Sequence, residues 1–183
     1  AARDSAGLRG LCRMAGTGPL HHHRPGRGPG AARLADVDLS PEPHRTPRRL
    51  AILAEGHFTP HDGKTARGVI RYGRDVIVAV IDASRAPGNV REDMGEGYDI
   101  PIVASLEEAL PRRPDALLIG IAPTGGRLPD SWRAAILLAI EHGLDVLSGL
   151  HTMLGDDPEF AAAARARGTA LVDYRRPPEG ATT

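Results

Sequence analysis

Two apolar runs in the middle of the chain constrain the fold more than any other feature. Asp75–Asp82 (DVIVAVID) and Asp115–Ala122 (DALLIGIA) are apolar throughout their interiors. Such runs are typical of strands buried on both faces, as in parallel sheets. Shorter runs of the same kind lie at Leu50–Glu55, Ile102–Val103, 144–149 and 169–174.

Helical patterns separate these strands. The sequence predicts a helix at about Thr65–Tyr72, and one at Ser105–Glu108, where the spacing is that of a capping box and Pro111 follows. Pro129 opens a further helix that Gly143 closes. Its predicted apolar face holds Trp132, Ile136, Ala139 and Ile140. Asp157-Pro158 begins the last helix and Gly168 ends it. This alternation predicts a Rossmann-like, doubly wound α/β fold, with a mostly parallel sheet and helices on both faces.

The predicted domain does not use the whole chain. Residues 1–47 are rich in Gly, Pro and Arg and have no periodicity, so we expect a disordered or loosely attached segment. Residues 48–176 form the predicted domain, and 177–183 resemble a linker towards a second domain. His21–His23 form an isolated triplet that we interpret as an exposed accident of sequence rather than a metal site.

Composition excludes several classes of function. The formal net charge is zero, so nothing favours a nucleic-acid or anionic-membrane partner. No apolar run approaches the roughly 20 residues that cross a bilayer. The single cysteine, Cys12, excludes an internal disulfide framework. We therefore expect a cytoplasmic protein.

Polar, glycine-rich loops gather at one edge of the predicted sheet. The loops that follow the strands are Glu55–Gly68, Asp82–Asn89, Ala122–Gly126 and Ser148–His151, whereas the loops that lead into strands are short. Ligands of open α/β sheets bind outside the carboxyl ends of the strands. This edge is therefore the predicted site.

The first of these loops ends in Gly63-Lys64-Thr65, and Lys64 is the chain's only lysine. A phosphate-binding P-loop would need glycine at position 58, where Phe58 stands, and the Gly-x-Gly-x-x-Gly pattern is also absent. An anion bound at the N-terminus of the following helix, with Lys64 adding charge, remains compatible with the sequence. Thr65 is either part of such a site or a simple N-cap.

Other candidates lie in the later loops, each with a structural alternative. Asp82 stands where an acid accepts a ribose hydroxyl in nucleotide-binding domains, but Asp is also common at strand ends. Arg85 can meet a phosphate or be solvated. Thr124 precedes Gly125-Gly126, whose N–H groups can face an oxyanion or form a turn. Ser148 and His151 follow the next strand; His151 can act as a base or be structural. Neither a Ser-His-acid triad nor metal-ligand spacing can be assembled.

Several of these segments together resemble one family. GKTARGVIRYG (63–73), GIAPTGG (120–126), LPDSW (128–132) and AIEHGLDVLSGLHTMLGDDPE (139–159) resemble the N-terminal domain of D-glutamate N-acetyltransferase-like proteins. The resemblance covers about Leu50–Pro178. Its shared features are Lys64-Thr65-Ala66-x-Gly68, the Gly-Gly before a Trp-bearing helix, and Ser-Gly-Leu-His at 148–151.

The resemblance implies acetyl transfer from acetyl-CoA to the amino group of D-glutamate, in D-amino-acid metabolism. It also implies a C-terminal P-loop domain that this chain does not contain. In that scheme His151 is the base, Gly125 and Gly126 face the oxyanion, and Lys64 and Arg85 meet substrate carboxylates. Acetyl-CoA would be a co-substrate, with no tightly bound cofactor, and a homo-oligomer is compatible. The rival interpretations are a non-catalytic nucleotide- or CoA-binding module, half of an NAD-dependent oxidoreductase, and a structural domain.

Overall fold

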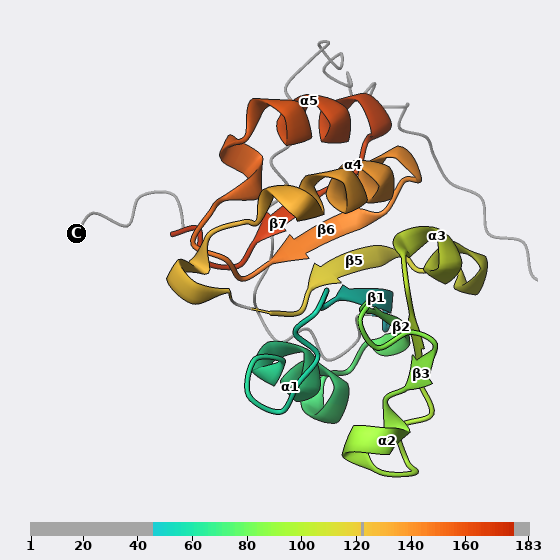
Figure 1. Cartoon of the computed structure of the whole chain (residues 1–183). Helices are drawn as coiled ribbons and strands as arrows, with labels where there is room; N and C mark the ends of the chain where they lie inside the picture. Colours follow the sequence, from blue (N-terminus) through green and yellow to red (C-terminus); the bar gives the residue numbers. More distant parts are fainter. Residues whose placement is uncertain (1–45, 122, 178–183) are drawn as a thin grey trace, which may run out of the picture. The chain divides into compact units, whose positions relative to one another are not determined.

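The computed structural model describes residues 46–121 and 123–177, and these form one mostly parallel sheet with flanking helices (Figure 1). The seven strands lie in the order β3-β4-β2-β1-β5-β6-β7. They span Arg49–Leu53 (β1), Val76–Ile81 (β2), Gly88–Asn89 (β3), Pro101–Val103 (β4), Ala116–Ile119 (β5), Asp145–Ser148 (β6) and Leu171–Asp173 (β7). Only β3 pairs antiparallel, with β4. The predicted fold class is confirmed.

The helices are α1 (Lys64–Tyr72), α2 (Arg91–Met94), α3 (Leu106–Ala109), α4 (Arg133–Glu141) and α5 (Pro158–Arg167). Short 3₁₀ turns lie at Leu110–Arg112 (η1), Thr124–Gly126 (η2), Asp130–Trp132 (η3) and Leu154–Asp156 (η4). β1 is central, with β2 on one side and β5 on the other. Right-handed crossovers in the two directions place α1 and α4 on opposite faces of the sheet. In Figure 1, α4 and α5 lie side by side, as their packing requires.

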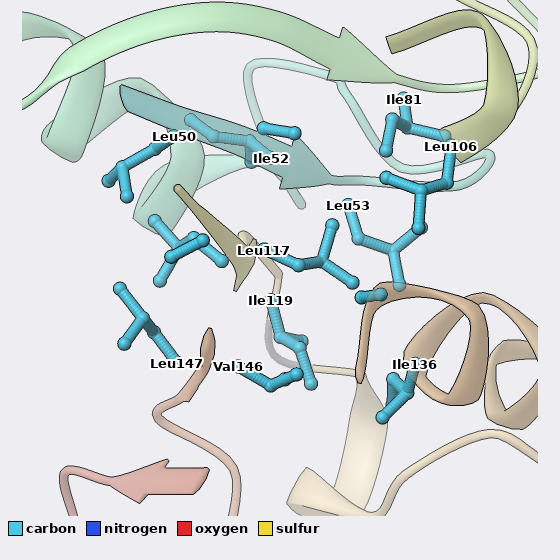
Figure 2. Close-up of a cluster of buried hydrophobic side chains, with 14 of the residues drawn as sticks. Leu50, Ile52, Leu53, Ile81, Leu106, Leu117, Ile119, Ile136, Val146 and Leu147 are labelled. Atoms are coloured by element: carbon cyan, nitrogen blue, oxygen red, sulfur yellow. The ribbon is translucent and has the colours of Figure 1, made fainter. Parts of the chain in front are cut away.

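The core sits between the central strands and these helices. Figure 2 shows Leu53 and Ile119 of the sheet in the same cluster as Leu106 of α3 and Ile136 of α4. The predicted apolar face of α4 is confirmed, since Trp132, Ile136, Ala139 and Ile140 are all buried. The core is one continuous cluster that extends from β4 to β7.

Two local predictions about helix ends differ from the structure. Thr65 is not the N-cap of α1, because the Gly63 carbonyl accepts the first helical hydrogen bond, from Arg67. Ser105 makes no capping hydrogen bond; Glu108 instead accepts from the N–H of Ala104 at 3.0 Å. The prediction for Pro111 agrees with the structure, because α3 ends at Ala109, and Pro111 lies inside the 3₁₀ turn η1 that follows.

The predicted terminal segments cannot be compared with the structure. Residues 1–45, with Cys12 and His21–His23, and residues 178–183 lie outside the described residues, so the boundaries at 47 and 177 stay predictions. Among the described helices, none is long and apolar enough to cross a membrane.

Candidate functional site

The carboxyl ends of β1 and β5 form the point at which the strand order reverses. The chain leaves β1 towards α1 and leaves β5 towards η2, so two loops diverge from neighbouring strands. Such a switch point is where open α/β sheets bind ligands. α1 begins close to the sheet here, because the N–H of Ala66 donates to the carbonyl of Gly120 at 2.7 Å. A Cβ on Gly120 would lie 2.2 Å from Cγ2 of Ile52 and 3.0 Å from Cβ of Ala66, so the close packing of α1 at this point favours glycine.

The loop after β1 is held by a buried carboxylate. Asp82 is 0% exposed. Its Oδ1 accepts from the N–H of Gly56 at 3.0 Å, and its Oδ2 accepts from the N–H of Phe58 at 3.0 Å. Oδ1 also accepts from the N–H and hydroxyl of Ser84, at 3.1 and 2.6 Å. Asp82 therefore orders the loop, and a ribose hydroxyl could reach it only by displacing one of these donors.

A second carboxylate lies beside the first. Burial raises the pKa of Glu55, the negative charge of Asp82 raises it further, and a backbone hydrogen bond from Ala83 lowers it in part. The sequence analysis did not single out Glu55. The signal that was available is its position, two residues after the end of β1 and close to the acid that follows the neighbouring strand β2.

Arg85 is engaged with the protein itself. Its guanidinium pairs with Asp93 of α2 and donates to the carbonyl of Phe58 at 2.7 Å. It also lies over the Phe58 ring, 5.7 Å from the centroid. These contacts fasten the β1–α1 loop to the segment after β2, so the predicted phosphate or carboxylate role for Arg85 would compete with three internal contacts.

Lys64 and Thr65 are exposed at the start of α1. No acceptor for their backbone N–H groups or for the Lys64 ammonium is found among the described residues. Gly63, the N-cap, is buried, and a Cβ there would lie 2.9 Å from the carbonyl oxygen of Thr59. The structure thus presents the helix N-terminus and Lys64 to solvent, in the arrangement that favours an anion.

The loops after β5 and β6 meet each other. The N–H groups of His151 and Thr152 donate to the carbonyl of Gly126 at 2.9 and 3.4 Å, and the hydroxyl of Thr152 accepts from the N–H of Leu128 at 3.2 Å. A Cβ on Gly126 would lie 2.1 Å from Cδ2 of His151, so the imidazole rests directly on the glycine. His151 is exposed. These contacts place the imidazole of His151 beside the turn of Gly125 and Gly126, both of which have a positive φ.

The two glycines differ in what they can offer a ligand. The N–H of Gly126 donates to the carbonyl of Pro123 at 2.7 Å, so the oxyanion role predicted for Gly126 would break this turn. Gly125 is exposed, with φ of 83°, and a Cβ there would meet nothing within 4 Å. Thr124 begins η2, and its side chain lies outside what the structure describes.

Ser148 is 1% exposed at the end of β6. Its hydroxyl accepts from the N–H of Leu150 at 3.2 Å, and its carbonyl accepts from the N–H of Tyr174 at 2.8 Å. Both contacts shape the turn that carries His151. A direct ligand contact by Ser148 would need that turn to open.

The predicted site residues therefore form two groups at one edge of the sheet. Asp82 and Arg85 organise the loop that leads to Lys64 and Thr65, whereas Gly126, Ser148 and His151 organise the turns after β5 and β6. The backbone hydrogen bond from Ala66 to Gly120 links the two loop regions at this edge. Among residues 46–121 and 123–177, no group of three metal-ligating side chains occurs.

Comparison with known proteins gives a consistent assignment. The family described as "Domain of unknown function (DUF1611_N) Rossmann-like domain" matches residues 84–177. A crystal structure of a DUF1611 family protein from Anabaena variabilis is similar, with a TM-score of 0.66 and 39% identity, covering 72% of this chain and 38% of that one.

Two curated relatives carry the name D-glutamate N-acetyltransferase. The protein from Tritonibacter scottomollicae is 42% identical over 73 residues, and that from a Pseudoalteromonas species is 34% identical over the same length. In each case the match covers 40% of this chain and 22% of the relative, so it spans about a fifth of their length. Since the family match covers more than half of the sequence and agrees with the observed sheet, the chain belongs to the DUF1611_N family of Rossmann-like domains.

Proposed function

We propose that this chain supplies the Rossmann-like part of an N-acetyltransferase that acetylates the amino group of D-glutamate or a related amino acid, with acetyl-CoA as donor. Relatives of that name at 42% and 34% identity support the reaction class. The observation that carries the proposal is the contact between His151 and Gly126 at the carboxyl edge of the sheet. It combines a titratable, exposed imidazole with a turn of two positive-φ glycines.

The reaction needs a base and a site for developing negative charge. The amino group of the substrate must lose a proton before its nitrogen can attack the thioester carbonyl, and in this proposal His151 takes that proton. The C–N bond forms, the carbonyl oxygen becomes an oxyanion, and the C–S bond then breaks, so that CoA leaves as the thiolate and takes up a proton. The exposed backbone of Gly125 is the part of the Gly-Gly turn that remains open to an oxyanion.

In this proposal Lys64 is the cation that is available to an anionic group of either substrate. It is exposed and has no internal acceptor among the described residues, whereas Arg85 is held by Asp93 and Phe58. The partner of this domain would be a C-terminal P-loop domain of the same protein, and the reaction would belong to D-amino-acid metabolism in the cytoplasm.

The experiment is a calorimetric titration of acetyl-CoA, D-glutamate and NAD into the chain. Saturable binding of acetyl-CoA or D-glutamate is expected. Binding of NAD alone would favour the oxidoreductase alternative, and the absence of binding by all three would contradict a ligand site on this domain.

A second experiment tests the base. His151→Ala should leave binding intact but abolish acetyl transfer by the complete enzyme, a loss of about 100-fold or more. His142→Ala, another exposed histidine, is the matched control; equal turnover of the two variants would remove the base assignment.

A further inference from the structure

A cationic groove runs along the exposed side of α1. The cavity has a volume of about 220 Å³, and Lys64, Arg67 and Arg71 line it together with Tyr72 and with Met94 of α2. Residues three and four apart share one face of a helix, so these three cations are stacked along the groove. Among the residues that the structure describes, no carboxylate lines it.

The charges in this groove are not neutralised by the protein. Among the described residues, Lys64, Arg67 and Arg71 form no ion pair, whereas Arg85, Arg133 and Arg176 are each paired with carboxylates. The chain as a whole has a formal net charge of zero, so three unpaired cations around one cavity are a local excess. A groove of this kind attracts anions.

Arg67 provides an independent observation. Its Nη2 donates to the carbonyl of Asp93 at a long 3.4 Å, while its buried Nη1 has no hydrogen-bond partner among the described residues. Buried donors of charged groups normally have acceptors. An anionic oxygen in the groove would supply the missing one.

The far end of the groove is aromatic. Hydrogen bonding to Tyr98, and then to Tyr72, raises the pKa of Arg71, which therefore stays charged. Tyr72 is 80% exposed, which is unusual for a large aromatic ring. An exposed ring beside cations is suited to stack on a nucleobase whose phosphate the cations hold.

We propose that this groove binds a phosphate monoester, with Lys64, Arg67 and Arg71 as its cationic ligands. The inference rests on the proposed function for the identity of the natural ligand, which would be the ribose phosphate of acetyl-CoA, with its adenine against Tyr72. A cavity of about 220 Å³ holds a phosphate group but not the whole cofactor. The remainder would run past the Lys64 end of the groove, towards the carboxyl edge of the sheet.

The test compares CoA with dephospho-CoA, which lacks only the ribose phosphate. Calorimetry at low ionic strength should show CoA binding at least tenfold more tightly to the wild-type chain. Lys64→Gln and Arg71→Gln, both at exposed positions, should reduce that ratio to near one. Arg74→Gln removes the same charge just beyond α1 and outside the groove, and should leave the ratio unchanged. Circular dichroism of each variant establishes that it is folded.

The outcomes separate the two proposals. CoA binding with the same affinity as dephospho-CoA, or losses in Arg74→Gln equal to those in Arg71→Gln, would overturn the groove while leaving the acetyltransferase proposal standing. Inorganic phosphate that binds through Arg71 and Lys64, in a chain that binds neither CoA nor acetyl-CoA, would support the groove and count against the acetyltransferase. Arg67→Met serves as a further variant, since it fills the same space without the charge and should abolish phosphate binding.

Discussion

The contact between Gly126 and His151 shows how a single residue type fixes the position of a functional side chain. Gly126 has φ of 63°, and the imidazole occupies the space where any Cβ would stand. Gly125, its neighbour, has φ of 83° but open space around it. The pair therefore separates the effect of backbone strain from the effect of contact with His151.

We predict that Gly126→Ala destabilises the chain by about 2–4 kcal/mol, because it adds an overpacked contact to the strain of a left-handed backbone. Gly125→Ala, the control, should cost only the strain, about 1–2 kcal/mol. Urea denaturation of both variants measures the difference. Equal losses would mean that the imidazole moves aside freely and that Gly126 does not position it.

Asp82 shows what sequence cannot resolve at this scale. Its place at the end of an apolar strand is visible in the sequence, and that place suits either a ribose ligand or a turn. Its donors, however, include the N–H groups of Gly56 and Phe58, which lie 26 and 24 residues away. Only the sheet pairing of β1 with β2 brings these groups together. The chemistry of the residue was therefore predictable, but its partners were not.

At the level of elements, α5 is the helix whose ends the sequence predicted most fully. Asp157 is its N-cap and accepts from the N–H groups of Glu159 and Phe160, Pro158 is its first residue, and Gly168 ends it with φ of 73°. The structure adds Arg133 of α4, which bonds Asp157 at 2.6 and 3.2 Å and Glu159 at 2.5 Å. The same guanidinium lies 4.3 Å from the centroid of Phe160. One side chain thus joins two helices.

This junction makes a pH-dependent contribution to stability. Hydrogen bonding to Arg133 lowers the pKa of Asp157 below its ordinary value of 3.8 in the folded chain. A carboxyl with a lowered pKa stabilises the fold above the unfolded-state pKa, and this contribution is lost as pH falls through the folded-state pKa. We therefore expect a loss of stability below about pH 4 from this group, of about 1 kcal/mol or less because the pair is partly solvated.

Urea denaturation between pH 2.5 and pH 7 tests this with Asp157→Asn, which keeps an N-capping oxygen but loses the charge. The variant should be less stable than wild type at pH 7 and should approach it at the acid end. Asp130→Asn, at an exposed position, is the control and should follow wild type throughout. A constant difference between Asp157→Asn and wild type at every pH would show that the charge of Asp157 contributes nothing.

The sequence did not predict the elements that are too short to show a periodic pattern of apolar residues. β3 has two residues and α2 has four, and both lie in a polar stretch around Val90, the buried residue of that segment. The long apolar strands and the amphipathic α4 were predictable because burial repeats along them. The start of α1 was misplaced by a residue because its N-cap, Gly63, has no side chain to reveal it.

For the whole molecule, alternating strands and helices predicted the fold class, and right-handed crossovers limited the topology. The edge that carries the candidate site followed from those two facts. The groove on α1 did not, although its signal was present: Lys64, Arg67 and Arg71 recur at helical spacing. Charges at that spacing usually mark a solvated face, and what distinguishes a groove from such a face is Met94 of α2, which lines the cavity beside α1.

Because the core is one continuous cluster, we predict that the domain unfolds as one unit. Ile52 of β1 lies on the side of the sheet that faces Ala66 of α1, whereas Trp132, the chain's single tryptophan, precedes α4. Both belong to the same buried cluster. We expect Ile52→Ala to cost about 3 kcal/mol and to shift the Trp132 fluorescence and far-UV circular dichroism transitions equally. Val76→Ala, at a 49% exposed position of β2, should shift neither by more than about 0.5 kcal/mol. A Trp132 transition that stays in place while the dichroism moves would mean that the two faces of the sheet fold independently, and the candidate site would then lie between two separately stable layers.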